Sequence, residues 1–139
     1  MNTLFKLLSA MILLSIPAGC EGFFAPPPGY IYMWEKLGAD KLEVKKALLE
    51  CGMPTPYDED SENREVSINA KATIYACMIQ AGFRYKDKAV SRAGGWCYTF
   101  KEENLPICQP GAVIPQRSVK KRLNSPYCKK SPVQPECKP

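Results

Sequence analysis

The chain has 139 residues, 19 Lys and Arg against 14 Asp and Glu, and a net charge of +5. It contains no histidine, which removes the commonest general base and the commonest metal ligand from any site. Its length suits one domain after removal of a leader, and its seven cysteines point to an oxidising compartment.

The N-terminus has the organisation of a secretory signal. Lys6 precedes an apolar run over residues 7–16, and small or helix-breaking residues follow at 17–19. A membrane-spanning helix needs about 20 apolar residues, so this run is too short to cross a bilayer. We expect residues 1–19 to be a signal peptide.

The end of this signal resembles the lipobox of bacterial lipoproteins, through Ala18, Gly19 and Cys20. The resemblance implies that the Cys20 sulfur is acylated, for example with palmitate, and that cleavage occurs just before it. The chain departs from the pattern at Pro17, where leucine is usual, so cleavage after Ala18 by ordinary signal peptidase is the alternative. The six further cysteines can pair with each other, which leaves Cys20 unpaired.

Residues 20–33 are expected to form the lipid anchor and a proline-rich tether, and residues 34–139 a single disulfide-bonded domain. The three prolines at 26–28 favour a stiff polyproline II segment. Phe23 and Phe24 either enter the lipid interface or pack on the domain.

Two helices are predicted over residues 40–51 and 67–81. Asp40 and Gly52 are the expected N-cap and stop of the first, whose apolar residues fall on one face and a narrower second stripe. The second ends at Gly82 and is apolar nearly all round, with Lys71 as its only charge. Such a helix is typically buried, so we expect it to be the central element.

The remainder of the chain reads as short elements. Alternating aromatic residues predict a hairpin of 83–90 against 96–101, around a glycine turn at 94–95. A short helix is expected over 118–124 and an irregular tail over 125–139. The predicted fold is α+β and mostly helical, a small disulfide-stapled domain.

Six cysteines allow about 15 pairings, and sequence alone does not choose among them. Closeness along the chain favours Cys128–Cys137 and Cys97–Cys108, which leaves Cys51–Cys77 to join the two helices. The main rival pairs Cys77 with Cys97 and Cys51 with Cys108. No two cysteines have the close spacing of a structural zinc site.

No catalytic, cofactor or metal site is predicted, and we expect the protein not to be an enzyme. The acidic residues Asp58, Asp60 and Glu62 alternate as in a calcium loop, but Asn63 stands where the turn glycine belongs. A solvated acidic loop fits better. The acidic pair Glu102 and Glu103 also lies in a run typical of solvated surface.

The C-terminal region is the basic part of the chain. Its candidate residues for an anionic partner are Arg117, Lys120, Lys121, Arg122, Lys129 and Lys130. Anionic lipid, polysaccharide or protein would suit them, while the lack of interleaved aromatics or a known module argues against nucleic acid. A solvated lysine-rich face is the alternative.

The sequence thus favours a lipid-anchored protein of a bacterial cell envelope with a non-catalytic binding or structural role. Glu21 after Cys20 favours the outer over the inner membrane. The alternatives are a secreted or periplasmic location, and a role as an inhibitor or exclusion factor against an incoming enzyme, phage or conjugation partner.

Overall fold

The computed structural model of the protein describes residues 29–57, 60–87 and 95–139. The signal, Cys20, Phe23 and Phe24 lie outside these ranges. The elements in chain order are α2 (Tyr30–Met33), β1 (Trp34–Glu35), α3 (Lys41–Glu50), α4 (Ser61–Arg64), α5 (Ile68–Gln80), β2 (Arg84–Tyr85), α7 (Trp96–Thr99), the 3-10 turns η2 (Lys101–Glu103) and η3 (Pro106–Cys108), α8 (Val119–Leu123), α9 (Pro126–Lys130) and η4 (Pro135–Cys137).

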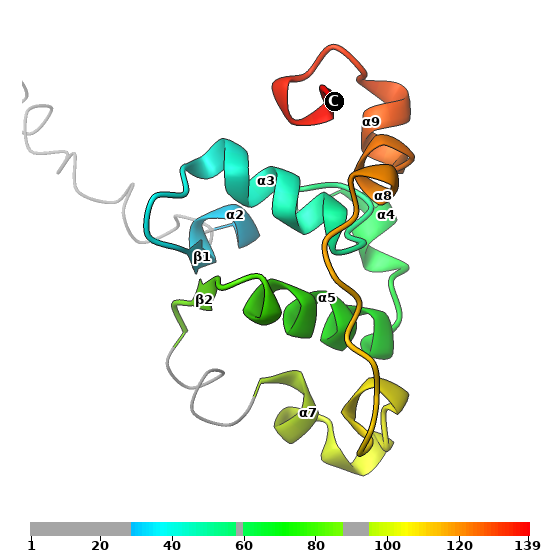
Figure 1. The fold of residues 1–139 in the computed structure, drawn as a ribbon. Helices are drawn as coiled ribbons and strands as arrows, with labels where there is room; N and C mark the ends of the chain where they lie inside the picture. Colours follow the sequence, from blue (N-terminus) through cyan, green and yellow to red (C-terminus); the bar gives the residue numbers. More distant parts are fainter. Residues whose placement is uncertain (1–28, 58–59, 88–94) are drawn as a thin grey trace, which may run out of the picture.

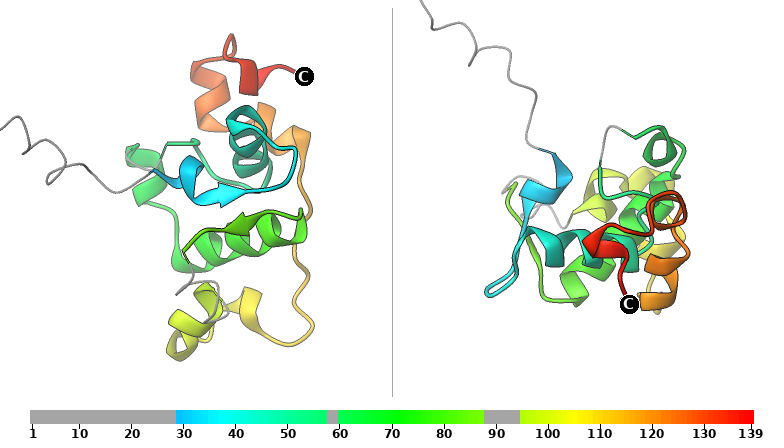
Figure 2. Two further views of the ribbon diagram at one scale, coloured as in Figure 1. Left: turned by 90° about the vertical axis from the view of Figure 1, so that its left-hand side faces the viewer. Right: turned by 90° about the horizontal axis from the view of Figure 1, so that it is seen from above.

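The elements stack in layers around α5. Helix α3 packs on one side of α5 and α7 with η3 on the other, while α8 and η4 pack on the far side of α3 (Figure 1). The left view of Figure 2, turned by 90° about the vertical axis, keeps the same order, with the C-terminal segments at the top and the α7 region at the bottom. An extended stretch after η3 carries the chain from one end of the stack to the other.

Both long helices form where the sequence predicts them, because their end signals are local. The Asp40 carboxylate accepts the Glu43 N–H at 2.9 Å, and the Ser67 hydroxyl accepts the Ala70 N–H at 3.1 Å. Gly52 has φ +104°, which lets the Met53 N–H reach the Leu48 carbonyl at 3.0 Å. Gly82 and Phe83 end α5 in the same way, so the shared Gly-apolar pattern is a Schellman motif in both helices.

The main core lies between α2, α3 and α5. Its largest members include Trp34, Leu48, Met78 and Phe83, all at most 3 % exposed. Helix α5 is central, but it is not buried all round, because Ile68 and Ile79 at its two ends keep 37 % and 44 % of their surface. The expectation from its composition is therefore only partly correct.

The domain begins earlier than the predicted boundary at residue 34. Residues Tyr30–Met33 form helix α2, and Ile31 is a buried member of the core. Residues 30–33 therefore belong to the domain and not to the predicted tether, and the rest of that predicted segment up to residue 28 lies outside the described residues. Tyr30 itself packs against Trp34 and Tyr85, with ring centroids 6.2 and 5.7 Å apart.

The molecule has a two-stranded antiparallel pair, and one strand lies in the predicted segment 83–90, but the predicted pairing with 96–101 is wrong. Residues Arg84–Tyr85 pair with Trp34–Glu35 and not with residues 96–101. Part of the predicted hairpin, residues 88–94, lies outside the described residues. Trp96 and Phe100 instead occupy successive turns and stack with centroids 5.1 Å apart, because an aromatic repeat also fits a helical turn.

All three favoured disulfides are present: Cys51–Cys77, Cys97–Cys108 and Cys128–Cys137. The first joins the C-terminal ends of α3 and α5 within the core. The rival pairing is excluded for these cysteines.

The C-terminal tail is ordered, which corrects the prediction of an irregular segment. The helix expected over 118–124 forms as α8, and a second one, α9, follows at once with a Ser125 cap and Pro126 in its first turn. Cys128 and Cys137 pack against Leu49, which is fully buried. Leu49, which belongs to the narrower apolar stripe of α3, is therefore covered by the tail.

Candidate functional site

A buried ionic cluster joins α3 to the C-terminal tail. Glu50, 6 % exposed, accepts hydrogen bonds from Arg117 Nε at 2.5 Å and from Arg122 Nε at 2.9 Å. Arg122 is only 4 % exposed, and its Nη1 donates to the carbonyl oxygens of Glu136 and Lys138 at 2.6 Å each. Arg122 therefore joins three segments that are far apart in the sequence.

A second buried carboxylate, Glu136, closes the other side of the tail. It is 2 % exposed, and its Oε1 accepts the Tyr127 hydroxyl at 2.6 Å. Burial raises the pKa of Tyr127 well above its usual range, and the hydrogen bond to Glu136 adds to the shift. The carboxylates of Glu50 and Glu136 thus both have hydrogen-bond partners within the fold.

The structure divides the predicted anionic-partner residues into two groups. Arg122 is buried, so it is not available to an external partner. Arg117 pairs with Glu43 and Glu50, and Lys130 pairs with Glu62. The members that remain exposed with no ion pair in the described part of the chain are Lys120, Lys121 and Lys129.

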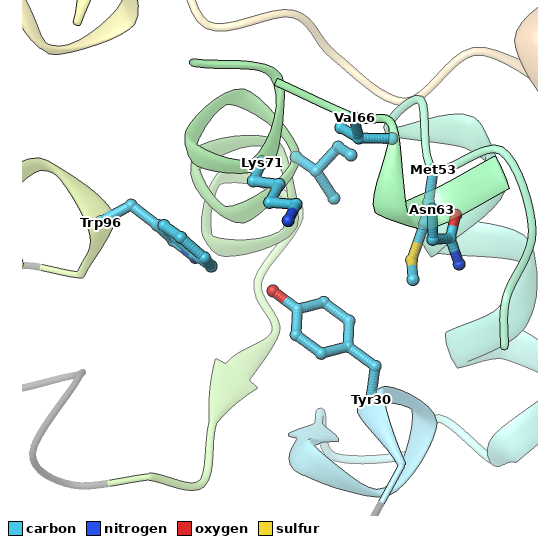
Figure 3. A pocket seen from close by; sticks show the side chains of 7 residues that line it. Tyr30, Met53, Asn63, Val66, Lys71 and Trp96 are labelled. Carbon is cyan, nitrogen blue, oxygen red and sulfur yellow. The ribbon is translucent and has the colours of Figure 1, made fainter. Parts of the chain in front are cut away.

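A cavity of about 160 Å³ opens between α2, α5, α7 and the segment around α4 (Figure 3). The sequence does not single it out as a site, because its walls come from separate parts of the chain. It is lined by Tyr30, Met53, Asn63, Val66, Lys71, Ile74 and Trp96.

A glycine places the aromatic wall of this cavity. Gly95 precedes Trp96 and has φ +70°, a conformation that favours glycine. A Cβ at this position would lie 2.4 Å from the Tyr75 ring, so the backbone can approach α5 only because residue 95 has no side chain. Trp96 is then held beside the cavity by its stacking on Phe100.

Asn63 fixes the wall opposite. Its amide nitrogen donates to the Thr55 and Tyr57 carbonyls at 3.1 and 2.7 Å, and its oxygen accepts the Thr55 N–H at 3.3 Å. Both ends of the buried amide are thus used to hold residues 55–57. The residue that breaks the calcium-loop pattern has a structural role.

Two polar side chains enter the cavity. The Lys71 amine and the Tyr30 hydroxyl point into the same space, close to the Trp96 ring (Figure 3). Within the described ranges, the Lys71 amine has no ion pair and no side-chain hydrogen bond among those the structure shows. Lys71 is the one charged residue of helix α5, and its amine faces a mainly apolar cavity. A single charge on a mostly apolar helix is the sequence signal that points to this site.

The acidic residues predicted to form a solvated loop are only partly described. Asp60 accepts the Thr55 hydroxyl at 2.6 Å and Glu62 pairs with Lys130, whereas Asp58 lies outside the described residues. The lysine amine lowers the pKa of the Glu62 carboxyl. Among the described residues, no group of three acidic or cysteine side chains is arranged to hold a metal ion.

Within residues 29–57, 60–87 and 95–139, no helix combines the length and apolar character that crossing a bilayer requires. Comparison of the chain with protein-family models, curated proteins and solved structures finds no match.

Proposed function

We propose that this protein is a lipid-anchored component of a bacterial cell envelope with a non-catalytic binding role at the membrane. The observation that carries the proposal is the cysteine pairing. Six of the seven cysteines form three disulfides with each other, so Cys20 has no cysteine left in the chain to pair with. A cysteine left over in this way needs a separate explanation, and acylation at a lipobox-like sequence that ends a secretory signal supplies one.

The bonding partners of the two buried carboxylates, Glu50 and Glu136, support a non-catalytic role. Glu50 is held by Arg117 and Arg122, and Glu136 by Tyr127. A general acid or base must reach a substrate proton, and these carboxylates are engaged with groups of the fold. The exposed acids Glu102 and Glu103 lie on a 3-10 turn at the surface.

Intact-mass analysis of the membrane-extracted protein tests the anchor. We expect the wild-type chain to begin at Cys20 and to carry diacylglycerol, with or without an acyl group on its amine. Reduction should add six hydrogen atoms, two for each of the three disulfides.

The control is Cys20→Ser, which should lose the lipid mass and leave the membrane fraction while gaining the same six hydrogens on reduction. A wild-type chain that begins at Gly19 and carries no lipid would refute the anchor.

We further propose that the exposed lysines of α8 and α9 contact anionic lipid head groups. Lys120, Lys121 and Lys129 remain on the surface after the neighbouring arginines have been used in the fold. A lysine near an anionic membrane contributes about 1 kcal/mol to binding. For an anchored protein, head groups are the nearest anionic surface.

Replacing Lys120, Lys121 and Lys129 by glutamine should weaken binding of the unacylated Cys20→Ser chain to phosphatidylglycerol vesicles by up to about 100-fold. Co-sedimentation at low salt measures this. The matched control replaces the exposed Lys41, Lys86 and Lys101, which changes the net charge equally. Equal losses in the two triple variants would mean that net charge alone drives binding, and the proposed contact would be wrong.

A further inference from the structure

We infer that the cavity between α2, α5 and α7 binds a small aromatic carboxylate, that is, one ring carrying an anionic group. This deepens the binding role proposed above and rests on it, but it does not require that the chain be acylated.

The size of the cavity indicates a single ring. Its volume is about 160 Å³. An apolar protein cavity of about 150 Å³ accommodates benzene. A bicyclic ligand or a long acyl chain would extend out of this space into solvent, whereas one six-membered ring would fill it.

The walls suit an aromatic ring. Val66 and Ile74 provide aliphatic contacts, and Trp96 on α7 and Tyr30 on α2 provide aromatic ones (Figure 3). Edge-to-face and offset contacts with such rings add to the free energy of burial. Asn63 lines the cavity but uses both ends of its amide on residues 55–57, so it does not compete for the ligand.

The charge at the cavity determines the rest of the ligand. The Lys71 amine points into the cavity beside the Tyr30 hydroxyl. An ammonium beside apolar walls favours an anion, and a carboxylate can accept a charge-assisted hydrogen bond from the amine. A neutral ring would fill the space but leave the ammonium without a counter-charge.

The test is a titration of the full mature chain carrying Cys20→Ser with phenylacetate, followed by two-dimensional NMR. Phenylacetate should bind with a Kd on the order of 1 mM, which is ordinary for a ligand of this size. The largest shifts should fall on the Trp96 indole, Tyr30 and Lys71. Phenylacetamide, which keeps the ring and loses the charge, should bind about tenfold more weakly, and acetate should give no shifts at these residues.

Lys71→Met should reduce the affinity for phenylacetate to that for phenylacetamide and leave phenylacetamide unchanged. Lys71→Arg should retain most of the phenylacetate affinity, which separates loss of charge from loss of fold. The matched control is Lys41→Met, an exposed lysine at the start of α3 outside the cavity, and it should bind phenylacetate as the parent chain does.

Equal affinity for phenylacetate and phenylacetamide, or unchanged affinity in Lys71→Met, would overturn the assignment. So would shifts confined to α8 and α9. Because every chain in this test lacks Cys20, its outcome is independent of the mass analysis, and failure of the anchor and failure of the ligand site are distinguishable.

Discussion

Replacing Arg122 by methionine is expected to lower the free energy of unfolding by about 3–5 kcal/mol. The guanidinium is 4 % exposed and donates to Glu50 and to the carbonyls of Glu136 and Lys138. Methionine matches much of its volume but donates to none of them. The buried carbonyl of Glu136 and the partly buried carbonyl of Lys138 would then lose this donor, and the Glu50 carboxylate would keep only Arg117.

Thermal and urea unfolding of the Cys20→Ser chain measures this change. For a domain of this size, the loss should lower the Tm by more than about 10 °C. Lys121→Met is the matched control, since it makes the same substitution one residue away at an exposed position of α8, and it should stay within about 0.5 kcal/mol of the parent. A loss of under about 1 kcal/mol in Arg122→Met would show that the buried cluster is not what holds the tail.

Local signals explain why parts of the fold are predictable. Asp40 and Ser67 cap their helices through bonds within three residues, and Gly52 ends its helix at a positive φ that few other residues adopt. Each signal is complete within one turn of chain. The sequence therefore predicts α3 and α5 nearly to the residue, and Ser118 does the same for α8.

Contacts between distant segments explain the errors. Strand β2 pairs with β1, although Trp34 lies about fifty residues before its partner Tyr85. No sequence pattern in either segment identifies the other as its pairing partner. The aromatic alternation at 96–100 fits either a strand or one helical turn, and the stacking of Trp96 on Phe100 decides for the helix. The ordered tail is a different kind of error, because the cap at Ser125 and the proline after it are local helix signals that the prediction of an irregular tail left unused.

The candidate sites also divide into features that the local sequence predicts and features that depend on contacts between distant segments. Arg122 and Lys120 are alike in sequence, since both are cations in a basic run, but only the fold shows that Arg122 meets a carboxylate 72 residues away. Counting charges therefore overstates the basic surface. Lys71 is the reverse case, because it is a single charge on an apolar helix, and that contrast is visible before the cavity is known.

The other large effect is expected from the disulfide between α3 and α5. Cys51→Ala with Cys77→Ala should lower the free energy of unfolding by about 3.5 kcal/mol through the freedom that the opened loop gives the unfolded chain. The two cysteines are 26 residues apart. Both are at most 2 % exposed in the main core, so the space left by the two sulfur atoms adds a packing loss.

Cys97→Ala with Cys108→Ala is the matched control, because it also removes one disulfide. Its loop spans 11 residues and its cysteines are only half-buried, so the loss should be smaller, about 2.8 kcal/mol from loop closure and little from packing. Urea unfolding of both double variants in the Cys20→Ser background compares them. The reverse order of stabilities would mean that the α7 region, and not the α3–α5 junction, limits the stability of the domain, and the core described here would not be its stabilising centre.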